Sequence, residues 1–356
     1  MKLLHSADWH LGSPLGGFEP AQREMLRQAL RSVPGQIARL CRREGCDLML
    51  LAGDLFDGPP DADSVAAVRE ALEEAAVPVL IAPGNHDWYD ARSVWATESW
   101  PGNVHIFSRA AVESVSLPEQ DCRVYGTAFE GMDCPGLLEG IRAAGPERFR
   151  IGVLHGDPTQ SASPYCPITS AQIAASGFDY LALGHIHKSG TVTAGKTLCA
   201  WPGCPMGRGF DETGAKGALL VTLEQTADLR FVPLEVPVFH DLETEAGEDP
   251  AAAVAALLPG AESRDFYRIT LTGPAEKPDL AALGRRFAGY PNLTLRDRTV
   301  PVQDLWRGAE EDSLEGVYFR KLRDLARGED PETREIALLA ARMSRDLLDG
   351  REVTLP

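Results

Sequence analysis

The chain has 356 residues, 44% of them hydrophobic, which suffices for a sizeable core and predicts one large domain with a smaller one. No run of about eighteen apolar residues occurs, and the N-terminus leads directly into an apolar strand, so we expect neither a membrane span nor a secretory signal. The formal net charge of −17 argues against a large basic surface for nucleic acid, although bound dications would supply local positive charge for a phosphate.

Seven cysteines are scattered through the sequence without any Cys-x-x-Cys spacing: Cys41, Cys46, Cys122, Cys134, Cys166, Cys199 and Cys204. An odd number without paired spacing argues against a disulfide framework and against a zinc ribbon. We therefore expect a protein of the reducing cytoplasm, where free thiols persist.

The first third of the chain alternates apolar strands with amphipathic helices, a pattern typical of an α/β fold. Buried strands are predicted over residues 1–7, 47–52 and 77–83. A helix is predicted over 19–44, where Pro34 introduces a kink. A second helix is expected to end near Ala76, with Asp63 or Ser64 as its N-terminal cap.

The middle of the chain is predicted to add a second sheet. In order, we expect short strands over 104–124, a helix over 135–144, a strand over 151–154, a helix over 168–176 and a strand over 180–183. The strand-like residues 191–233 are interpreted as the second sheet of a β-sandwich with helices outside. Four aromatic residues, Trp88, Tyr89, Trp95 and Trp100, are assigned to packing in preference to stacking on bases.

Five of the predicted strands end in turns that carry Asp, Asn or His. The ligand-type side chains at these strand ends are Asp8, His10, Asp54, Asn85, His155, His185 and His187. In α/β sheets the carboxyl ends of strands are where ligands bind. These residues supply enough nitrogen and oxygen ligands for two divalent ions. A buried, hydrogen-bonded imidazole would explain one such histidine but not four, whereas His5, His105 and His240 are interpreted as structural.

The order of these motifs resembles the calcineurin-like metallophosphoesterases: Asp-x-His, Gly-Asp, Gly-Asn-His-Asp, His-Gly-Asp and Gly-His-x-His. Residues Leu4–Gly12 and Leu51–Asp57 resemble the DNA-repair exonuclease branch of that family, which holds SbcD-like and YhaO-like nuclease subunits. Gly203–Glu212 and Gly214–Gly217 extend the similarity more weakly. The resemblance implies a four-layer α-β-β-α sandwich with a small C-terminal α+β capping domain and a helical tail.

Carried over to matching positions, the resemblance assigns Asp8, His10, Asp54 and His187 to one metal ion and Asp54, Asn85, His155 and His185 to the other. It makes His86 the catalytic histidine that is not a ligand, and Asp87 is expected to orient an imidazole or the turn. The family usually uses manganese, and iron or zinc are alternatives for nitrogen and oxygen ligands. Two positions depart from the family pattern: Asp57 replaces a histidine linked in some relatives to opening of strand ends, and Cys204 replaces a small polar residue.

Composition changes near residue 240, and three regions are predicted: a nuclease domain over 1–238, a capping domain over 239–310 and a helical tail over 311–356. The capping domain is expected to contain a strand over 267–273, a helix over 279–287 and a strand over 292–297. The tail carries two amphipathic helices interrupted at 328–331. They either pack on the chain's own body or, as the resemblance implies, bind the coiled-coil root of an SbcC-like ATPase.

The predicted function is DNA hydrolysis by two divalent ions, as a 3′→5′ exonuclease with some single-strand endonuclease activity in DNA repair. In this chemistry a hydroxide that bridges the ions attacks phosphorus, and His86 supplies a proton to the leaving oxygen. The acidic charge predicts weak DNA binding by this chain alone, so the ATPase partner would supply much of the grip. The resemblance also implies a homodimer, whose interface no pattern locates.

Two other functions stay open. The acidic charge favours a phosphodiesterase on a small nucleotide-type substrate, which the capping domain and the Ser6-Ala-Asp-Trp-His10 signature oppose. An inactive assembly subunit is opposed by the complete set of ligand residues. A protein phosphatase is disfavoured because such enzymes commonly have Gly-Asn-His-Glu where this chain has Gly84-Asn-His-Asp87. The sequence does not decide the digestion polarity, the preference for DNA or RNA, or the native metal.

Overall fold

The structure is a computed structural model that describes residues 1–260, 263–302, 304–350 and 353. It divides into two compact units, one of Met1–Asp241 with Ser263–Arg268 and one of Leu242–Glu262 with Ile269–Pro356. Parts of the predicted capping domain (261–262 and 303) and of the predicted tail (351–352 and 354–356) lie outside the described residues. The three predicted domain boundaries stay a prediction.

The first sheet of the first unit has the strand order β12-β11-β1-β2-β3-β4. Its strands are β1 (Lys2–Ser6), β2 (Leu48–Leu51), β3 (Val79–Ile81), β4 (Val104–Ile106), β11 (Gly217–Leu223) and β12 (Ala227–Pro233). Strands β1 to β4 are parallel, with Leu3 opposite Leu48 and Leu51 opposite Ile81. Residues Leu48–Leu51 are all buried because parallel strands are covered on both faces, which explains their uninterrupted apolar run.

The second sheet has the strand order β5-β6-β7-β8-β10-β9. Its strands are β5 (Glu113–Leu117), β6 (Cys122–Gly126), β7 (Phe149–His155), β8 (Tyr180–Gly184), β9 (Gly190–Ala194) and β10 (Thr197–Trp201). Strands β7 and β8 are parallel, and His155 lies opposite Gly184. The register therefore ends both strands at the same edge of the sheet, immediately before the polar turns.

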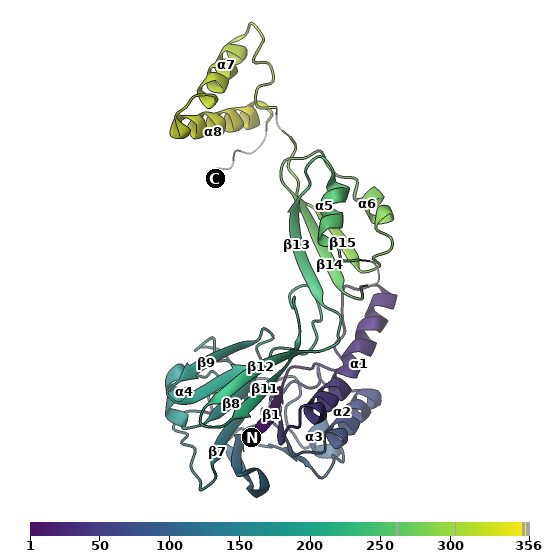
Figure 1. Cartoon of the computed structure of the whole chain (residues 1–356), viewed down its shortest axis with the longest axis vertical. Coiled ribbons are helices and arrows are strands. Elements are labelled where there is room, and N and C mark those ends of the chain that lie inside the picture. Colours follow the sequence, from purple (N-terminus) through teal and green to yellow (C-terminus); the bar gives the residue numbers. More distant parts are fainter. Residues whose placement is uncertain (261–262, 303, 351–352, 354–356) are drawn as a thin grey trace. The chain divides into compact units, whose positions relative to one another are not determined.

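Helices cover the outer faces of the two sheets (Figure 1). They are α1 (Pro20–Arg43), α2 (Ala62–Ala75), α3 (Val94–Thr97) and α4 (Ser170–Ser176), while the 3₁₀ turn η1 (Pro118–Gln120) connects β5 to β6. In α1 the buried residues Leu26, Leu30 and Val33 share one face and pack with the first sheet. A separate apolar cluster, including Leu50 and Ile151, lies between the sheets. The predicted α/β class and α-β-β-α layering are confirmed.

Three local predictions were wrong. Residues 135–144, all within the described part of the chain, form turns and irregular backbone, and Gly140 adopts a left-handed φ of 72° that ends any helix there. Strands β11 and β12 belong to the first sheet, because β11 pairs antiparallel with β1. The cap of α2 is Asp61, whose side chain accepts the N–H of Ser64 at 2.7 Å.

Five C-terminal elements match the predicted types, whereas the strand Phe239–Glu245 and the helix Pro250–Leu257 were not predicted. The sheet order is β13-β14-β15, and the elements are β13 (Phe239–Glu245), β14 (Phe266–Thr272), β15 (Leu293–Asp297), α5 (Pro250–Leu257), α6 (Leu280–Arg286), α7 (Leu314–Ala326) and α8 (Pro331–Leu348). Val254, Ile269 and Leu271 form the centre of the second unit's own apolar cluster. Across the described residues, none of the helices combines the length and apolar character needed to traverse a bilayer.

Candidate metal centre

The strand-end turns of the two sheets converge on one site. The turn after β1 is tied to the turn after β2, because Asp8 N–H donates to Gly53 O at 3.0 Å and His10 N–H to Asp54 O at 2.9 Å. The second sheet joins through His185, whose N–H donates to Asp8 Oδ1 at 2.8 Å. These contacts therefore hold the turns of Asp8, His10, Asp54 and His185 together.

Four of the predicted ligand residues adopt the left-handed backbone region, which residues other than glycine rarely occupy. Their φ angles are 55° for Asp8, 49° for His10, 52° for Asp54 and 93° for His185. Such a conformation costs on the order of 1–3 kcal/mol per residue and persists at functional sites, where the surrounding structure imposes it. Gly84 permits the close approach of the turns, since a Cβ there would lie 2.2 Å from Asp54 Oδ1.

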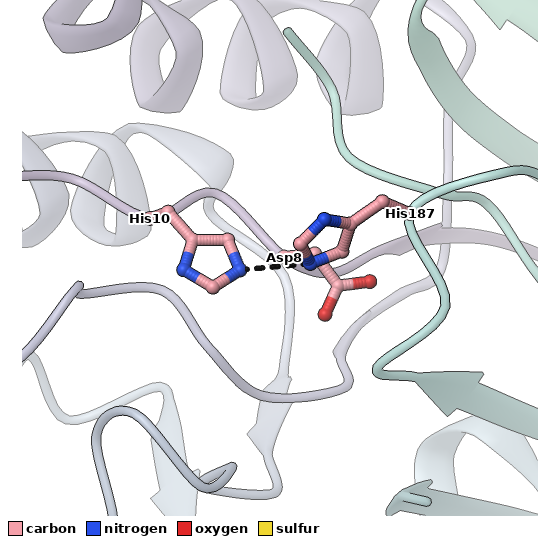
Figure 2. A group of neighbouring side chains, drawn as sticks. All are labelled: Asp8, His10 and His187. Carbon is pink, nitrogen blue, oxygen red and sulfur yellow. Dashed lines mark hydrogen bonds between the residues drawn. The ribbon is translucent and has the colours of Figure 1, made fainter. Parts of the chain in front are cut away.

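The first group of ligand atoms comes from Asp8, His10 and His187, which lie within 4.8 Å of one another (Figure 2). The Nδ1–H of His187 donates to Glu212 Oε1 at 2.7 Å, and Nδ1 of His10 lies 3.4 Å from Asp57 Oδ1. Carboxylates only accept, so each Nε2 carries a lone pair. These two Nε2 atoms face each other at 3.1 Å, an arrangement that a cation between them stabilises.

The second group is built around His155 and Asp54. The Nδ1–H of His155 donates to Ala52 O at 2.9 Å, and its Nε2 faces only oxygen acceptors, Asn85 Oδ1 at 2.9 Å and Asp54 Oδ2 at 3.4 Å. A proton or a cation on Nε2 satisfies these oxygens. Asp54 Oδ2 also lies 3.7 Å from His10 Nε2. Asp54 is therefore the carboxylate between the two groups, as a bridging ligand must be.

The electrostatics of the site fit divalent cations. Burial lowers the pKa of His155, but the carboxylates of Asp54 and Asp8 more than offset this and raise it to about 9. These carboxylates therefore favour a positive charge at the His155 imidazole. Burial also opposes ionisation of Asp54, yet the imidazoles of His155 and His10 hold its pKa below the usual range. Within the described residues, Asp8 Oδ2 is buried without a hydrogen-bond partner and is free for a metal ion.

His185 lies at the edge of this arrangement. Its ring centroid is 5.2 Å from that of His155 and 4.9 Å from that of Tyr165. Burial and the neighbouring His155 lower the pKa of His185 to about 4, so the imidazole is neutral at pH 7, as a metal ligand must be. Among the described residues, His185 is outside the groups whose ligand atoms all lie within 4.8 Å of one another.

His86 is held by Asp57, a contact that the sequence did not reveal. The Nδ1–H of His86 donates to Asp57 Oδ1 at 2.7 Å, and its ring centroid lies 4.8 Å from that of His10. Hydrogen bonding to Asp57 raises the pKa of His86, and hydrogen bonds from His10 and His86 hold the pKa of Asp57 far below its usual range. The arrangement favours a protonated imidazole, although its ligand atom is also near enough to Asp54 and His10 to bind a metal.

Among the described residues, the hydrogen bonds of the Asp87 carboxylate are to backbone N–H groups. Its carboxylate accepts N–H groups from Leu55 at 2.8 Å, Gly84 at 2.8 Å and Asp54 at 3.1 Å. Asp87 was predicted to orient either an imidazole or the turn, and these hydrogen bonds support orientation of the turn. Burial and the nearby Asp54 raise the pKa of Asp87 to about 7. Asp87 thus links the turn after β2 to the turn after β3.

Glu212 is a further site residue that the sequence did not single out. It is buried, and besides the Nδ1–H of His187 it accepts two hydrogen bonds from the Arg208 guanidinium, at 2.7 and 3.3 Å. These contacts hold the pKa of Glu212 far below its usual range, against the opposing effect of burial. The carboxylate fixes the tautomer in which His187 Nε2 can bind a metal. No local pattern marks Glu212, because it follows His187 by 25 residues in a loop.

Replacing Glu212 by Gln is expected to weaken metal binding by about 10-fold or more, because the neutral amide no longer holds the Nδ1–H of His187 as strongly. Titration of the metal-free protein with Mn²⁺, followed by calorimetry, measures this change. Asp211→Asn is the matched control, since Asp211 is the exposed neighbour. Equal affinities in the two variants would contradict the role given to Glu212.

The three histidines interpreted as structural lie apart from these groups. His5 is buried with Nδ1 2.8 Å from the Tyr180 hydroxyl and Nε2 3.0 Å from Leu183 O, and burial lowers its pKa to about 3. His240 pairs with Asp265 at 3.2 Å, and His105 is exposed beside Phe107. All seven cysteines, each within the described residues, are free and buried.

Comparison with known proteins finds a family of phosphoesterases. The sequence model of the family described as calcineurin-like phosphoesterase matches residues 1–189, more than half of the chain. The chain is 35% identical over 241 residues to the uncharacterized metallophosphoesterase YhaO of Bacillus subtilis, which covers 62% of this chain and 57% of that protein. It is 24% identical over 270 residues to the SbcD subunit of the nuclease SbcCD of the same organism, covering 62% and 66%. The chain thus spans less than two thirds of the length of these relatives.

Among solved structures, a dimetal phosphatase from Danio rerio superimposes with a TM-score of 0.42 at 13% identity, covering 65% of this chain and 96% of that one.

Proposed function

This chain belongs to the calcineurin-like phosphoesterase family, and on that premise we propose that it hydrolyses phosphodiester bonds of DNA. The observation that carries the proposal is the two pairs of facing nitrogen and oxygen atoms, His10 with His187 and His155 with Asn85, which Asp54 joins. The similarity to the SbcD subunit of the nuclease SbcCD from two bacteria supports DNA as the substrate. Members of the family bind two divalent metals, and the mixture of imidazole and oxygen donors supports Mn²⁺, with iron or zinc as alternatives.

The two ions, when bound, neutralise phosphate charge and lower the pKa of water. The chain's own residues set the remaining conditions. Asp8, His10 and His187 would hold one ion, and His155, His185 and Asn85 would hold the other, with Asp54 between the two groups. His86, protonated and oriented by Asp57, donates a proton to the leaving oxygen. Asp87 keeps the turns of Asp54 and His86 in register through its backbone contacts.

The test is digestion of end-labelled single- and double-stranded DNA with added Mn²⁺, with bis-p-nitrophenyl phosphate in parallel and Asp54→Asn as the inactive control. Shortened DNA with an inert variant supports the nuclease, and the pattern of products gives the polarity. If the small diester is cleaved and DNA stays intact even with a candidate ATPase, the nuclease proposal fails and a second function takes its place. That function, a phosphodiesterase on a small nucleotide-type substrate, is favoured by the net charge of −17.

We extend the proposal to DNA repair in the cytoplasm with an SbcC-like coiled-coil ATPase, which would offset weak DNA binding by this chain. The helices α7 and α8 support a docking role because they expose large apolar side chains: Leu314, Val317, Tyr318, Leu325, Ile336, Leu347 and Leu348. Other residues of the same helices are buried, such as Phe319 and Ala341, which pack with Ala309. A homodimer, as the family resemblance implies, is tested by light scattering after size-exclusion chromatography.

Deleting residues 313–356 is expected to leave a folded protein that binds metal and hydrolyses bis-p-nitrophenyl phosphate, because the residues of the metal centre extend no further along the chain than Glu212. Circular dichroism, metal content and turnover measure this result. The ATPase partner should bind the full chain and fail to bind the truncated one. An insoluble product would indicate that α7 and α8 serve the chain's own packing.

A further inference from the structure

A cavity of about 600 Å³ adjoins the candidate metal centre. It is formed by the loop that leads into α2, by α2 itself, by the turn after β3 and by α3. The volume lies in the range of roughly 300–1,000 Å³ that is usual for sites that bind small molecules. All of these elements belong to the first unit, and α2 and α3 lie next to each other (Figure 1).

His86 is the side chain that connects this cavity with the metal centre. Among the described residues, the cavity is lined by His86 and Asp87 but by none of the seven predicted metal ligands. His86 also faces His10, with ring centroids 4.8 Å apart. Because His86 donates a proton to the leaving oxygen in the proposed reaction, a group bound in this cavity would be the leaving group of the phosphodiester.

The lining has the chemistry of a site for a flat, uncharged group. Pro59, Pro60, Val65 and Val94 provide apolar surface, and Trp88 provides an aromatic ring. The lining has no excess of positive charge, because Arg69 pairs with Glu98 at 3.8 Å and the remaining ionisable residues are Arg92, His86, Asp87 and Asp90. A phosphate would require an excess of positive charge, whereas a nucleobase needs stacking surface and a few hydrogen-bonding groups.

Trp88 differs in its surroundings from the other aromatic residues of this region. Trp95 is buried, with its ring 5.3 Å from both Phe56 and Trp100, and Tyr89 and Trp100 pack against the same core cluster. The surroundings of Trp95, Tyr89 and Trp100 therefore agree with the prediction that these residues serve packing. Trp88 is half-buried and packs against the apolar cluster on the outer face of the second sheet, and it also contributes to the wall of the cavity, with its Nε1–H donating to Asp90 Oδ2 at 3.3 Å.

We infer that this cavity binds the nucleoside of the leaving group, with its base beside Trp88. The inference rests on the proposed hydrolysis of phosphodiesters and adds a subsite for one nucleoside. The leaving nucleoside is the one whose oxygen separates from phosphorus and takes up the proton, while water adds to phosphorus. In a DNA strand this nucleoside becomes the new strand end, and in a dinucleotide it is released as a free nucleoside.

The test compares two inhibitors of bis-p-nitrophenyl phosphate hydrolysis, deoxyadenosine and inorganic phosphate. Filling the cavity through its exposed wall residues, by Thr97→Trp or Ala62→Trp, is expected to weaken inhibition by deoxyadenosine at least 10-fold and to leave inhibition by phosphate unchanged. Trp88→Ala should weaken deoxyadenosine inhibition by about 10-fold through loss of stacking. Ser99→Trp is the matched control, because Ser99 is exposed and outside the lining.

A substrate comparison separates the two sources of the nucleoside. If Thr97→Trp lowers kcat/KM for a dinucleotide but not for a single-stranded oligonucleotide, the subsite serves small substrates. If Thr97→Trp lowers kcat/KM for both, the subsite also binds DNA ends. Unchanged inhibition by deoxyadenosine, with unchanged kcat/KM for both substrates, would overturn the inference. If the wild-type protein hydrolysed no diester at all, the proposed function would fail instead, and equilibrium dialysis of deoxyadenosine with wild type and Thr97→Trp would still test the cavity.

Discussion

Replacing Asp54 by Asn should lower the hydrolysis of bis-p-nitrophenyl phosphate by about 10³-fold or more and reduce the number of bound metal ions. Asp54 is the carboxylate that lies between the two ligand groups, 3.7 Å from His10 Nε2 and 3.4 Å from His155 Nε2. The amide has almost the same shape but no charge, so it neither offsets the charge of two dications nor bridges them. The loss therefore reports on charge and coordination more than on packing.

Turnover and metal content of Asp54→Asn are measured after dialysis against Mn²⁺, the latter by elemental analysis. Asp228→Asn serves as the control, since it makes the same chemical change at an exposed strand residue. A thermal unfolding curve in the presence of chelator separates loss of metal from loss of fold. Full activity and two bound ions in Asp54→Asn would refute the arrangement of the centre around this carboxylate.

His86→Ala should retain both metal ions and lose about 10²–10⁴-fold in kcat, the usual contribution of a general acid. The imidazole is held by Asp57 at 2.7 Å, and its position beside the metal ligands suits proton delivery to a leaving oxygen. His105→Ala is the control because it removes an exposed imidazole elsewhere in the first unit. If His86→Ala bound fewer ions than the wild type, His86 would be a ligand, as its distance to Asp54 and His10 permits.

The pH dependence provides a second measurement of the same role. The hydrogen bond to Asp57 raises the pKa of His86, and a reaction that needs protonated His86 slows as pH rises through that pKa. Asp57→Asn removes the negative charge that stabilises the imidazolium, so the pKa of His86 falls and the loss of rate begins at a lower pH. The profile of kcat against pH, at saturating Mn²⁺, shows this displacement. An unchanged basic limb would contradict the pairing of Asp57 with His86.

Much of the site could be predicted because its signals are local. An apolar strand followed at once by Asp, Asn or His is visible within ten residues, and parallel strands must end at one edge of a sheet. That reasoning identified Asp8, Asp54 and His155, and the structure brings their ligand atoms within 4.8 Å. The same local character explains the accurate placement of α1 and α8, whose apolar residues repeat at helical spacing.

What the sequence by itself determined is the chemistry of the strand-end turns and the alternation of strands and helices. The tertiary structure alone decided which distant groups meet. The apolar run of β11 suits either sheet, and only its pairing with β1 placed it in the first. The role of Asp57 depends on its contact with His86, which the sequence does not show. Glu212 belongs to the centre only because its loop returns to His187. Hydrogen bonds between side chains on different loops leave no periodic trace along the chain, because they depend on where the loops go and not on local propensity.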